Sequence, residues 1–333
     1  MKTIQQLARE KIIILDGAMG TMIQQHNFSE DDFRPEELKN HGQPLKGNND
    51  LLSVSQPMAI LNIHRSYLEA GADIIETNTF NSTAISQADY GLEEWVFRVN
   101  QESAELAMQA CAEFSTPDHP RFVAGSIGPT NKTTSMSPDV NNPGFRAVTF
   151  DDLVKTYTEQ VLGLIAGGVD VFLVETVFDT LNAKAALFAI NQVNQNTTKH
   201  YPVMLSGTIT DSSGRTLSGQ TTRAFLISVQ QANLFSIGLN CALGAKQLVP
   251  YLDVLSEHAS CAVSAHPNAG LPDEMGEYTE TPELMAIQIK EYLDRKMVNI
   301  VGGCCGTTPE HIQAIAELAK QYEPREYGTT ISA

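Results

Sequence analysis

The sequence predicts a (β/α)8 barrel, a single α/β domain over residues 1–333 with a polar tail at residues 326–333. Eight short apolar runs alternate with eight longer segments of helical composition, which is the element count of this fold. The length suits a barrel of about 250 residues or more with extended loops. A doubly wound open sheet is the alternative, but no glycine fingerprint for a dinucleotide follows the first run.

The eight predicted strands are short, apolar and rich in β-branched residues, as is typical of strands buried in a parallel sheet. They cover Ile12–Leu15, Asp73–Thr77, Arg121–Ser126, Asp170–Glu175, Pro202–Gly207, Ser236–Asn240, Ser260–Ala265 and Val298–Gly303.

Eight helical segments follow or separate these strands, and several begin at residues that favour helix N-caps. The expected N-caps include Asp151, Thr281 and Thr308. The segments cover Pro57–Ala70, Glu93–Phe114, Asp151–Gly168, Thr180–Asn194, Thr222–Ala232, Lys246–His258, Thr281–Lys296 and Thr308–Gln321.

The charge balance excludes some classes of partner. The chain has 22 Lys and Arg against 39 Asp and Glu, a formal net charge of −17. A nucleic-acid groove or an anionic membrane surface needs clustered Lys and Arg, so we expect neither partner. The longest apolar runs, such as Val161–Val169, fall far short of the roughly 20 residues of a membrane span. The apolar stretch Ile12–Leu15 is too short for a signal peptide, and we therefore expect a cytoplasmic protein.

Polar residues follow nearly every predicted strand. In barrel enzymes the chemistry lies at the C-terminal ends of the strands. Three cysteines and three carboxylates converge on this one predicted rim, which indicates a functional site. The strand ends carry Asp16-Gly17, Glu76-Thr77-Asn78-Thr79, Ser126, Glu175-Thr176, Ser206, Asn240-Cys241, His266-Pro267-Asn268 and Gly302-Gly303-Cys304-Cys305-Gly306.

The three rim cysteines, Cys241, Cys304 and Cys305, are the candidate metal ligands and catalytic residues. The glycines around the vicinal pair would let the backbone leave strand geometry, so that both sulfurs can converge. Strands six and eight share a parity, which places Cys241 level with the pair. Three thiolates with an open fourth position fit a catalytic zinc ion. A redox-active vicinal pair and three buried cysteines are the alternatives.

The remaining ligand candidates carry weaker signals. His266 is placed like a ligand, but a hydrogen-bonded structural histidine is the favoured interpretation. Asn268 lies just past the seventh strand, and its amide oxygen is a candidate for the fourth zinc position in the absence of substrate, with water or His266 as alternatives. Cys111 and Cys261 lie far from the rim and are expected to pack in the core.

A three-thiolate zinc centre is suited to holding a substrate thiol. A free thiol has a pKa of about 8.5 and is mostly protonated at neutral pH. Coordination to zinc removes that proton, and the electron-rich centre keeps the sulfur nucleophilic. Alkyl transfer to sulfur is the expected chemistry. Asp16 and Glu175 would bind an ammonium group of the same substrate, and backbone N–H groups at Gly17 and Ala18 would bind its carboxylate.

The motifs resemble those of the zinc-dependent homocysteine S-methyltransferase family, and most closely the N-terminal homocysteine-binding module of cobalamin-dependent methionine synthases. The resemblance covers about residues 10–325 and implies a (β/α)8 barrel, zinc on the three rim cysteines and homocysteine near Asp16 and Glu175. The motifs are Leu15-Asp16-Gly17-Ala18-Met19-Gly20-Thr21, Lys46-Gly47-Asn48-Asn49-Asp50, Glu76-Thr77-Asn78-Thr79-Phe80, Gly128-Pro129-Thr130-Asn131, Glu175-Thr176-Val177-Phe178-Asp179-Thr180, Ser206-Gly207-Thr208-Ile209-Thr210-Asp211, Gly238-Leu239-Asn240-Cys241 and Gly302-Gly303-Cys304-Cys305-Gly306.

The resemblance also implies a methyl donor and partners. No Asp-x-His-x-x-Gly motif for cobalamin is present. Methylcobalamin is therefore expected on another module or chain, alongside a folate-binding module, in the same full-length protein or as a separate subunit. The long loops His26–Asn49 and Gly128–Thr149 offer only Phe28, Phe33 and Phe145 as aromatic residues. That composition argues against a closed pocket for a small cationic donor.

Three other functions remain open. One is a stand-alone homocysteine methyltransferase that uses S-methylmethionine or another small donor. Another is a metal-free lyase or aldolase, which would need a lysine at a strand end, whereas Lys184 and Lys246 fall in helical segments. The third is a homocysteine-binding module without catalysis.

Overall fold

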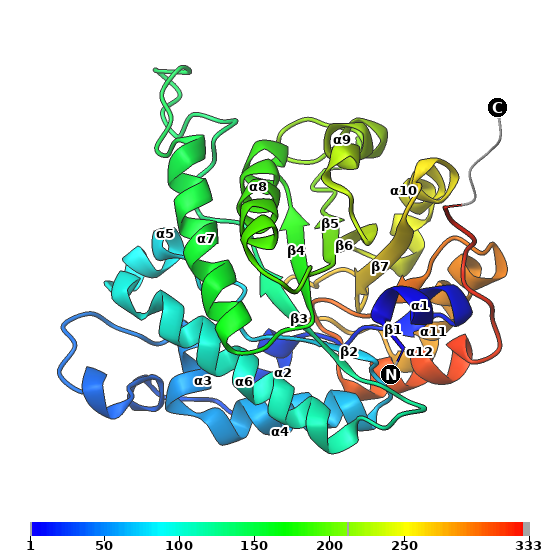
Figure 1. The fold of residues 1–333 in the computed structure, drawn as a ribbon, viewed down its shortest axis with the longest axis horizontal. Coiled ribbons are helices and arrows are strands. Elements are labelled where there is room, and N and C mark those ends of the chain that lie inside the picture. Colours follow the sequence, from blue (N-terminus) through cyan, green and yellow to red (C-terminus); the bar gives the residue numbers. More distant parts are fainter. Residues whose placement is uncertain (1, 212, 329–333) are drawn as a thin grey trace.

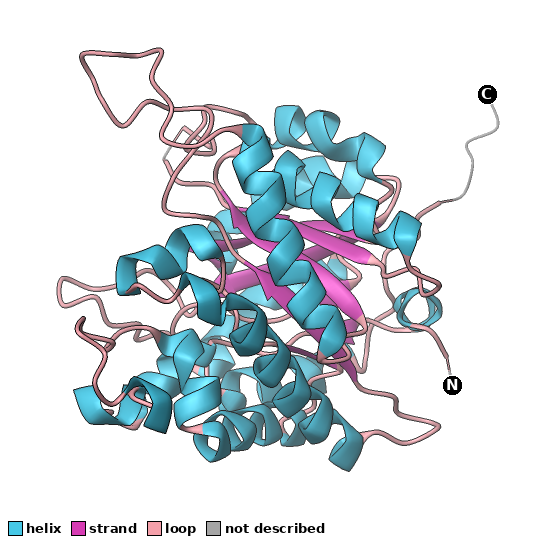
Figure 2. Ribbon diagram, turned by 60° about the vertical axis from the view of Figure 1, so that its left-hand side comes forward, coloured by secondary structure: helices cyan, strands magenta, loops and turns pink. Residues whose placement is uncertain are grey.

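Eight parallel strands form a barrel in this computed structural model, which describes residues 2–211 and 213–328. The strand order is β1-β8-β7-β6-β5-β4-β3-β2, and a parallel bridge between Leu15 and Ile74 joins the two end strands. Helices pack around the outside of the strands (Figures 1 and 2). The prediction of a single (β/α)8 TIM barrel is confirmed. In the predicted polar tail, residues 329–333 lie outside the described residues.

All eight predicted strands are present, although four of them run past their predicted ends. β3 and β7 continue to Ile127 and Asn268. β4 and β6 continue to Val177 and Gly244, and the pairing register shifts in both of these extensions. The strands are β1 (Ile13–Ile14), β2 (Ile74–Glu76), β3 (Phe122–Ile127), β4 (Val171–Val177), β5 (Val203–Gly207), β6 (Ser236–Gly244), β7 (Ala262–Asn268) and β8 (Ile300–Val301).

Each predicted helical segment contains a helix, and shorter helices occur where none was expected. The α-helices are α1 (Ile4–Glu10), α2 (Met19–Gln25), α3 (Leu52–Ser55), α4 (Pro57–Glu69), α5 (Ala84–Gln87), α6 (Val96–Phe114), α7 (Phe150–Ala166), α8 (Thr180–Asn196), α9 (Thr222–Val229), α10 (Ala245–His258), α11 (Pro282–Asp294) and α12 (Pro309–Ala319). The 3-10 helices are η1 (Glu30–Phe33), η2 (Glu36–Leu38), η3 (Asn49–Leu51), η4 (Ala88–Tyr90), η5 (Glu93–Trp95) and η6 (Gln230–Ala232).

The N-caps of the later helices agree with the sequence, with one exception. Thr281 and Thr308 precede α11 and α12 as expected. The prediction of Asp151 as the N-cap of α7 is wrong, because Thr149 and Asp152 form a reciprocal capping box there. Asp151 instead lies in the first turn, where its negative charge still favours the helix dipole.

Successive side chains of the strands alternate between two apolar layers, one inside the barrel and one between the strands and the helices. Val171 and Leu173 of β4 point into the barrel, whereas Phe172 and Val174 pack against the surrounding helices. The short helix α1 adds Ile4 and other side chains to the inner layer, at its N-terminal end. In β2, β3 and β4 the same alternation directs Glu76, Ser126 and Glu175 into the barrel mouth.

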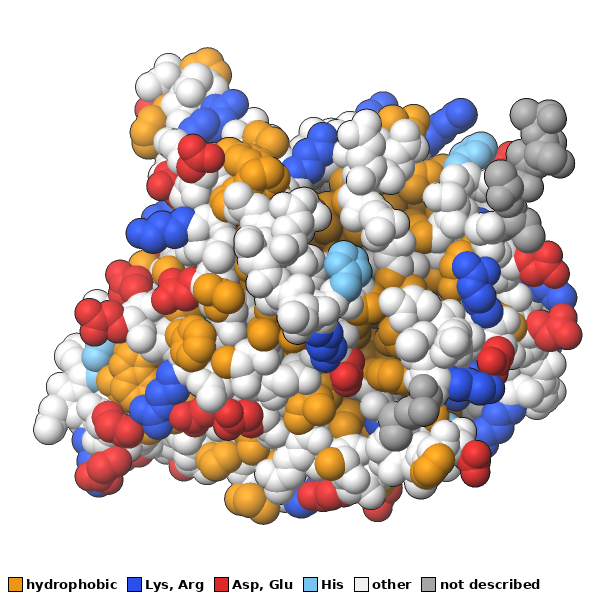
Figure 3. All heavy atoms as spheres, viewed as in Figure 1, with side chains coloured by type: hydrophobic (Ala, Val, Ile, Leu, Met, Phe, Trp, Pro, Cys, Tyr) orange, Lys and Arg blue, Asp and Glu red, His pale blue; other side chains and the backbone are white. Residues whose placement is uncertain are grey.

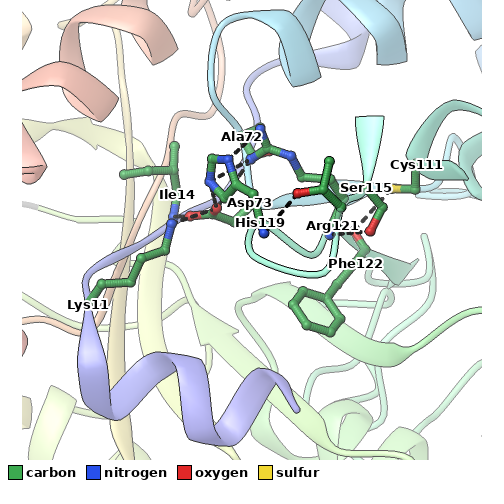
Figure 4. Close-up of polar contacts among 10 residues, drawn as sticks. Lys11, Ile14, Ala72, Asp73, Cys111, Ser115, His119, Arg121 and Phe122 are labelled. Atoms are coloured by element: carbon green, nitrogen blue, oxygen red, sulfur yellow. Dashed lines mark hydrogen bonds and ion pairs between the residues drawn. The ribbon is translucent and has the colours of Figure 1, made fainter. Parts of the chain in front are cut away.

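An ion-pair network lies at the opposite end of the barrel, just before β2 (Figure 4). Asp73 is fully buried, and its Oδ1 lies 2.7 Å from Lys11 Nζ and 3.2 Å from Arg121 Nη1. His119 Nε2 lies 3.3 Å from the same oxygen, and Ile14 N donates to Asp73 Oδ2. Burial alone would raise the pKa of Asp73, but contacts with His119 and Lys11 hold it below its usual range.

The surface shown in Figure 3 carries Lys and Arg side chains singly, among acidic and uncharged ones. The loop of residues 128–149 extends beyond α7 at the upper left of Figure 1. Within the described part of the chain, no helix has the length and hydropathy needed to cross a membrane.

Candidate metal and substrate site

A cavity of about 730 Å³ opens at the C-terminal end of the barrel. Residues at the ends of β1, β2, β3, β4, β6, β7 and β8 line it, together with the loop after β7. Neither Lys nor Arg lines this cavity among the residues that the structure describes. Seven of the eight sequence-predicted site residues line this cavity, and Asn268 does not. The seven are the three rim cysteines with Asp16, Gly17, Ala18 and Glu175.

The three rim cysteines converge as the sequence predicts. Cys241 Sγ lies 3.6 Å from Cys305 Sγ, and the three sulfurs lie within 4.8 Å of one another. Sulfur atoms bound tetrahedrally to zinc at about 2.3 Å lie about 3.8 Å apart, so this spacing fits a metal ion. Within the described residues, these three cysteines form the one group of His, Cys, Asp or Glu that meets this distance criterion.

A strained backbone aims Cys241 at its partners. Cys241 and Ala242 have φ values of +61° and +58°, in the left-handed region that non-glycine residues rarely adopt. Such conformations cost on the order of 1–3 kcal/mol each and persist where the surrounding structure imposes them. They coincide with the register shift between β6 and β7. This strain could not be predicted from residue type, because neither residue is a glycine or an asparagine.

The glycines beside the vicinal pair also act as predicted, by permitting unusual backbone paths. Gly306 has φ +78°, and a Cβ atom there would lie 2.2 Å from Tyr278 Cβ. A Cβ atom on Gly303 would lie 2.4 Å from Thr307 Oγ1. The loop carrying Cys304 and Cys305 therefore requires glycine for close packing as well as for backbone freedom.

The pKa values of Cys304 and Cys305 are shifted in opposite directions. Hydrogen bonds from Cys241 and Cys304 lower the pKa of Cys305 to about 3, and Tyr278 adds a further contact. Contacts with Cys241 and Cys305, together with burial, raise the pKa of Cys304 well above its ordinary value. The cluster thus favours a negative sulfur, which is the form that binds a metal cation.

Two predicted carboxylates lie in the same cavity, deeply buried. Asp16 and Glu175 are 2% and 6% exposed. Ser126 Oγ donates to Glu175 Oε1 at 2.5 Å, and Asn240 Nδ2 lies 3.5 Å from Glu175 Oε2. Burial raises the pKa of both carboxyl groups. The backbone of Thr176, next to Glu175, lies in the left-handed region with φ +53°. A buried acidic site of this kind suits a cationic group.

The predicted carboxylate-binding backbone is only partly available. Ala18 N donates to Thr307 Oγ1 at 3.1 Å, so its N–H already has an acceptor. Gly17 packs tightly, since a Cβ atom there would lie 2.7 Å from Thr307 Oγ1. The substrate-binding roles of Gly17 and Ala18 stay predictions.

His266 and Asn268 differ in their positions. His266 lines the cavity, its Nε2 has no partner among the described residues, and burial lowers its pKa to about 3, so the ring is neutral. Asn268 Oδ1 is also buried without a described partner. Backbone hydrogen bonds join the residues on either side of Asn268 to the loop of the vicinal cysteines. Cys304 N donates to Pro267 O, and Ala269 N donates to Cys305 O. Its role as a fourth ligand stays a prediction.

The structure adds cavity residues to which the sequence analysis assigned no role. Tyr278 comes from the loop after β7, where no periodic pattern marked it, and its side chain contacts Cys305. Asn240 contacts both Glu175 and Cys304. Glu76 ends β2 and lines the cavity, and its side chain approaches Glu175. Asn240 and Glu76 are among the strand-end residues of the predicted rim, although neither had been given a specific role. Cys111 and Cys261 pack at the core, as predicted.

Fold and site together define a class of protein: a (β/α)8 barrel whose C-terminal cavity carries three thiols at a spacing that fits a metal ion. The chain belongs to the homocysteine S-methyltransferase family, whose model matches residues 13–319. This membership supports a homocysteine S-methyltransferase activity.

Solved structures share this fold. The metallated form of the homocysteine methyltransferase MmuM from Escherichia coli is similar with a TM-score of 0.72 and 21% identity, over 94% of this chain and 98% of that chain. The oxidized form of the same enzyme has a TM-score of 0.71 and 20% identity, over 93% and 97% of the two chains. At these identities the likeness concerns the fold.

Proposed function

We propose that this protein is a zinc-dependent homocysteine S-methyltransferase that accepts a methyl group from methylcobalamin and forms methionine. One observation carries the proposal: three thiols within 4.8 Å of one another share a cavity with the buried carboxylates Asp16 and Glu175. Homocysteine is a thiol with an ammonium group, so each half of the substrate has a matching part of the site.

The chain's own residues would supply three functions. Cys241, Cys304 and Cys305 would hold zinc, which when bound keeps the substrate sulfur ionised at neutral pH. Asp16 and Glu175 would orient the amino acid through its ammonium group. With the substrate held at both ends, a donor methyl group would have to approach the sulfur in line.

A protein-borne donor needs a surface on which to dock. Several loops that follow strands carry exposed apolar side chains, with Val140 and Met275 exposed by 92% and 86%. Others are Phe145, Leu217 and Leu271. These side chains support docking of a cobalamin-binding module, with a folate-binding module completing the cycle, in the same chain or as a separate subunit.

A small sulfonium donor such as S-methylmethionine is the second candidate, and the cavity itself favours it. Phe80 and the buried carboxyl group of Asp50 line the cavity, whereas the loop composition had suggested no such pocket. Burial raises the pKa of Asp50 to about 6, so this carboxyl group is mainly ionised at neutral pH and can attract a cation.

Methyl transfer with different donors tests the proposal. The zinc-loaded chain is incubated with homocysteine and either free methylcobalamin, S-methylmethionine or betaine, and methionine is quantified. We expect slow methionine formation from methylcobalamin and little from the other two. Efficient turnover with S-methylmethionine and none with methylcobalamin would favour the small-donor enzyme. Absence of turnover with every donor, despite homocysteine binding, would favour a binding module.

A further inference from the structure

Glu76 stands beside the two carboxylates to which the proposed function gives a role. It is the last residue of β2, and its backbone N donates to Asp16 Oδ2 at 2.9 Å. Its carboxyl group lies within hydrogen-bonding reach of Glu175. Like Ile74, two residues earlier, its side chain points into the barrel. Three carboxyl groups from β1, β2 and β4 thus share one wall of the cavity.

Carboxylate oxygens on this wall of the cavity lack good hydrogen-bond donors from the described chain. Asp16 Oδ1 is buried and has no partner among the described residues. Glu175 Oε2 has a long contact of 3.5 Å from Asn240 Nδ2, and the Glu175 carboxyl group also faces that of Glu76. No hydrogen bond from an N–H or O–H group of the described chain reaches the Glu76 carboxyl group, and neither Lys nor Arg lines the cavity there. Burial and mutual repulsion raise the pKa of Asp16 and Glu76.

The unused acceptors on this wall suit an ammonium group. A primary ammonium carries three N–H donors that diverge from one nitrogen, one for each carboxyl group. Charge-assisted hydrogen bonds of this kind are about twice as strong as neutral ones.

We infer that Glu76 is the third carboxylate of the ammonium site and determines the preference for an amino thiol over a thiol that lacks the amino group. This inference rests on the proposed function, since it takes homocysteine as the substrate. It assigns Glu76 a direct contact with the substrate, whereas a residue that only braced Glu175 would affect every thiol in the same way.

Binding of two thiols separates these roles. Homocysteine and 4-mercaptobutyrate differ only in the amino group, and calorimetric titration of the zinc-loaded chain gives both affinities. We expect the wild-type chain to prefer homocysteine by at least about tenfold. Glu76→Gln is expected to reduce this preference by about tenfold or more, which equals about 1.4 kcal/mol. Its affinity for 4-mercaptobutyrate should stay within about threefold of wild type.

The controls make the result specific. Glu277→Gln removes an exposed carboxylate from the rim of the same cavity and should leave the preference unchanged. Glu76→Asp keeps the charge and should retain more of the preference than Glu76→Gln. Zinc content shows that each variant is folded, and if Glu76→Gln loses zinc, the comparison of Glu76→Asp with wild type decides.

Equal losses for both thiols in Glu76→Gln, or an unchanged preference, would overturn the inference and leave the proposed function standing. The binding titrations contain no methyl donor and do not depend on methyl transfer. A failure of methyl transfer in the donor experiment would therefore overturn the proposed function and leave the binding result unaffected. A wild-type chain that binds both thiols equally would overturn the role of the whole carboxylate wall.

Discussion

Cys241 Sγ lies 3.6 Å from Cys305 Sγ, although 64 residues separate them in the chain. Cys241 lies within β6 and Cys305 follows β8, with β7 between these two strands. Pairing with β7 fixes both strands, and the left-handed backbone at Cys241 and the glycine-flanked loop at Cys305 complete the approach. The thiol pair is thus a product of barrel closure and local strain together.

The first prediction concerns the metal. We expect about one zinc ion per chain, and Cys304→Ala should lose both zinc and activity, because two thiolates form a much poorer site. Cys241→Ala and Cys305→Ala should behave alike. Zinc is measured by elemental analysis of the purified proteins.

The two core cysteines provide the matched controls for this experiment. Cys111→Ala and Cys261→Ala should keep zinc, since neither lines the cavity. A Cys304→Ala chain that still holds stoichiometric zinc and forms methionine would show the ligand assignment to be wrong.

The second prediction concerns Glu175. Glu175→Gln keeps the shape and the contact with Ser126 but removes a buried negative charge from the ammonium site. We expect kcat/KM for homocysteine to fall by about tenfold or more, equivalent to about 1.4 kcal/mol. Steady-state kinetics with intact zinc content checks this, and Glu274→Gln, in the loop after β7, serves as the control. Unchanged kinetics in Glu175→Gln would mean that Glu175 only orders the loop after β4.

The barrel and its cysteine cluster could be predicted because their signals are local or periodic. Strand length, helix composition and the polar residue at each strand end are all visible in the chain. The contact between Tyr278 and Cys305 was not visible, because it depends on how a loop without periodicity folds over Gly306. The bond from Ala18 N to Thr307 Oγ1 joins residues 289 positions apart, and it occupies an N–H group expected to face the substrate.

The third prediction concerns Asn268 in the absence of substrate. Its buried Oδ1 has no described partner, and backbone bonds on either side tie its strand end to the cysteine loop. A metal ion would satisfy this oxygen. We therefore expect Asn268→Ala to change the visible spectrum of the cobalt-loaded chain without homocysteine, while the spectrum with homocysteine stays as in wild type. Tyr278→Phe, which removes the hydroxyl beside Cys305, is the comparison variant. Identical spectra of Asn268→Ala and wild type without substrate would remove Asn268 as a ligand.

The last prediction concerns stability and its dependence on pH. Asp73 is buried between Lys11 and Arg121, and Arg121 is itself largely buried. Asp73→Asn would leave the Arg121 guanidinium without its buried counter-charge, and removing one member of such a pair costs about 3–5 kcal/mol.

The pKa of Asp73 is lowered in the folded protein, so its ionised form stabilises the fold above the unfolded-state pKa of about 3.9. That contribution is lost as pH falls through the lower folded-state value. Urea denaturation should therefore show a large destabilisation by Asp73→Asn at pH 7 that shrinks below about pH 3. Asp118→Asn, a neighbour outside the network, should change stability little at either pH. An equal loss for Asp73→Asn at both pH values would show that the side-chain charge contributes nothing and that packing alone explains the effect.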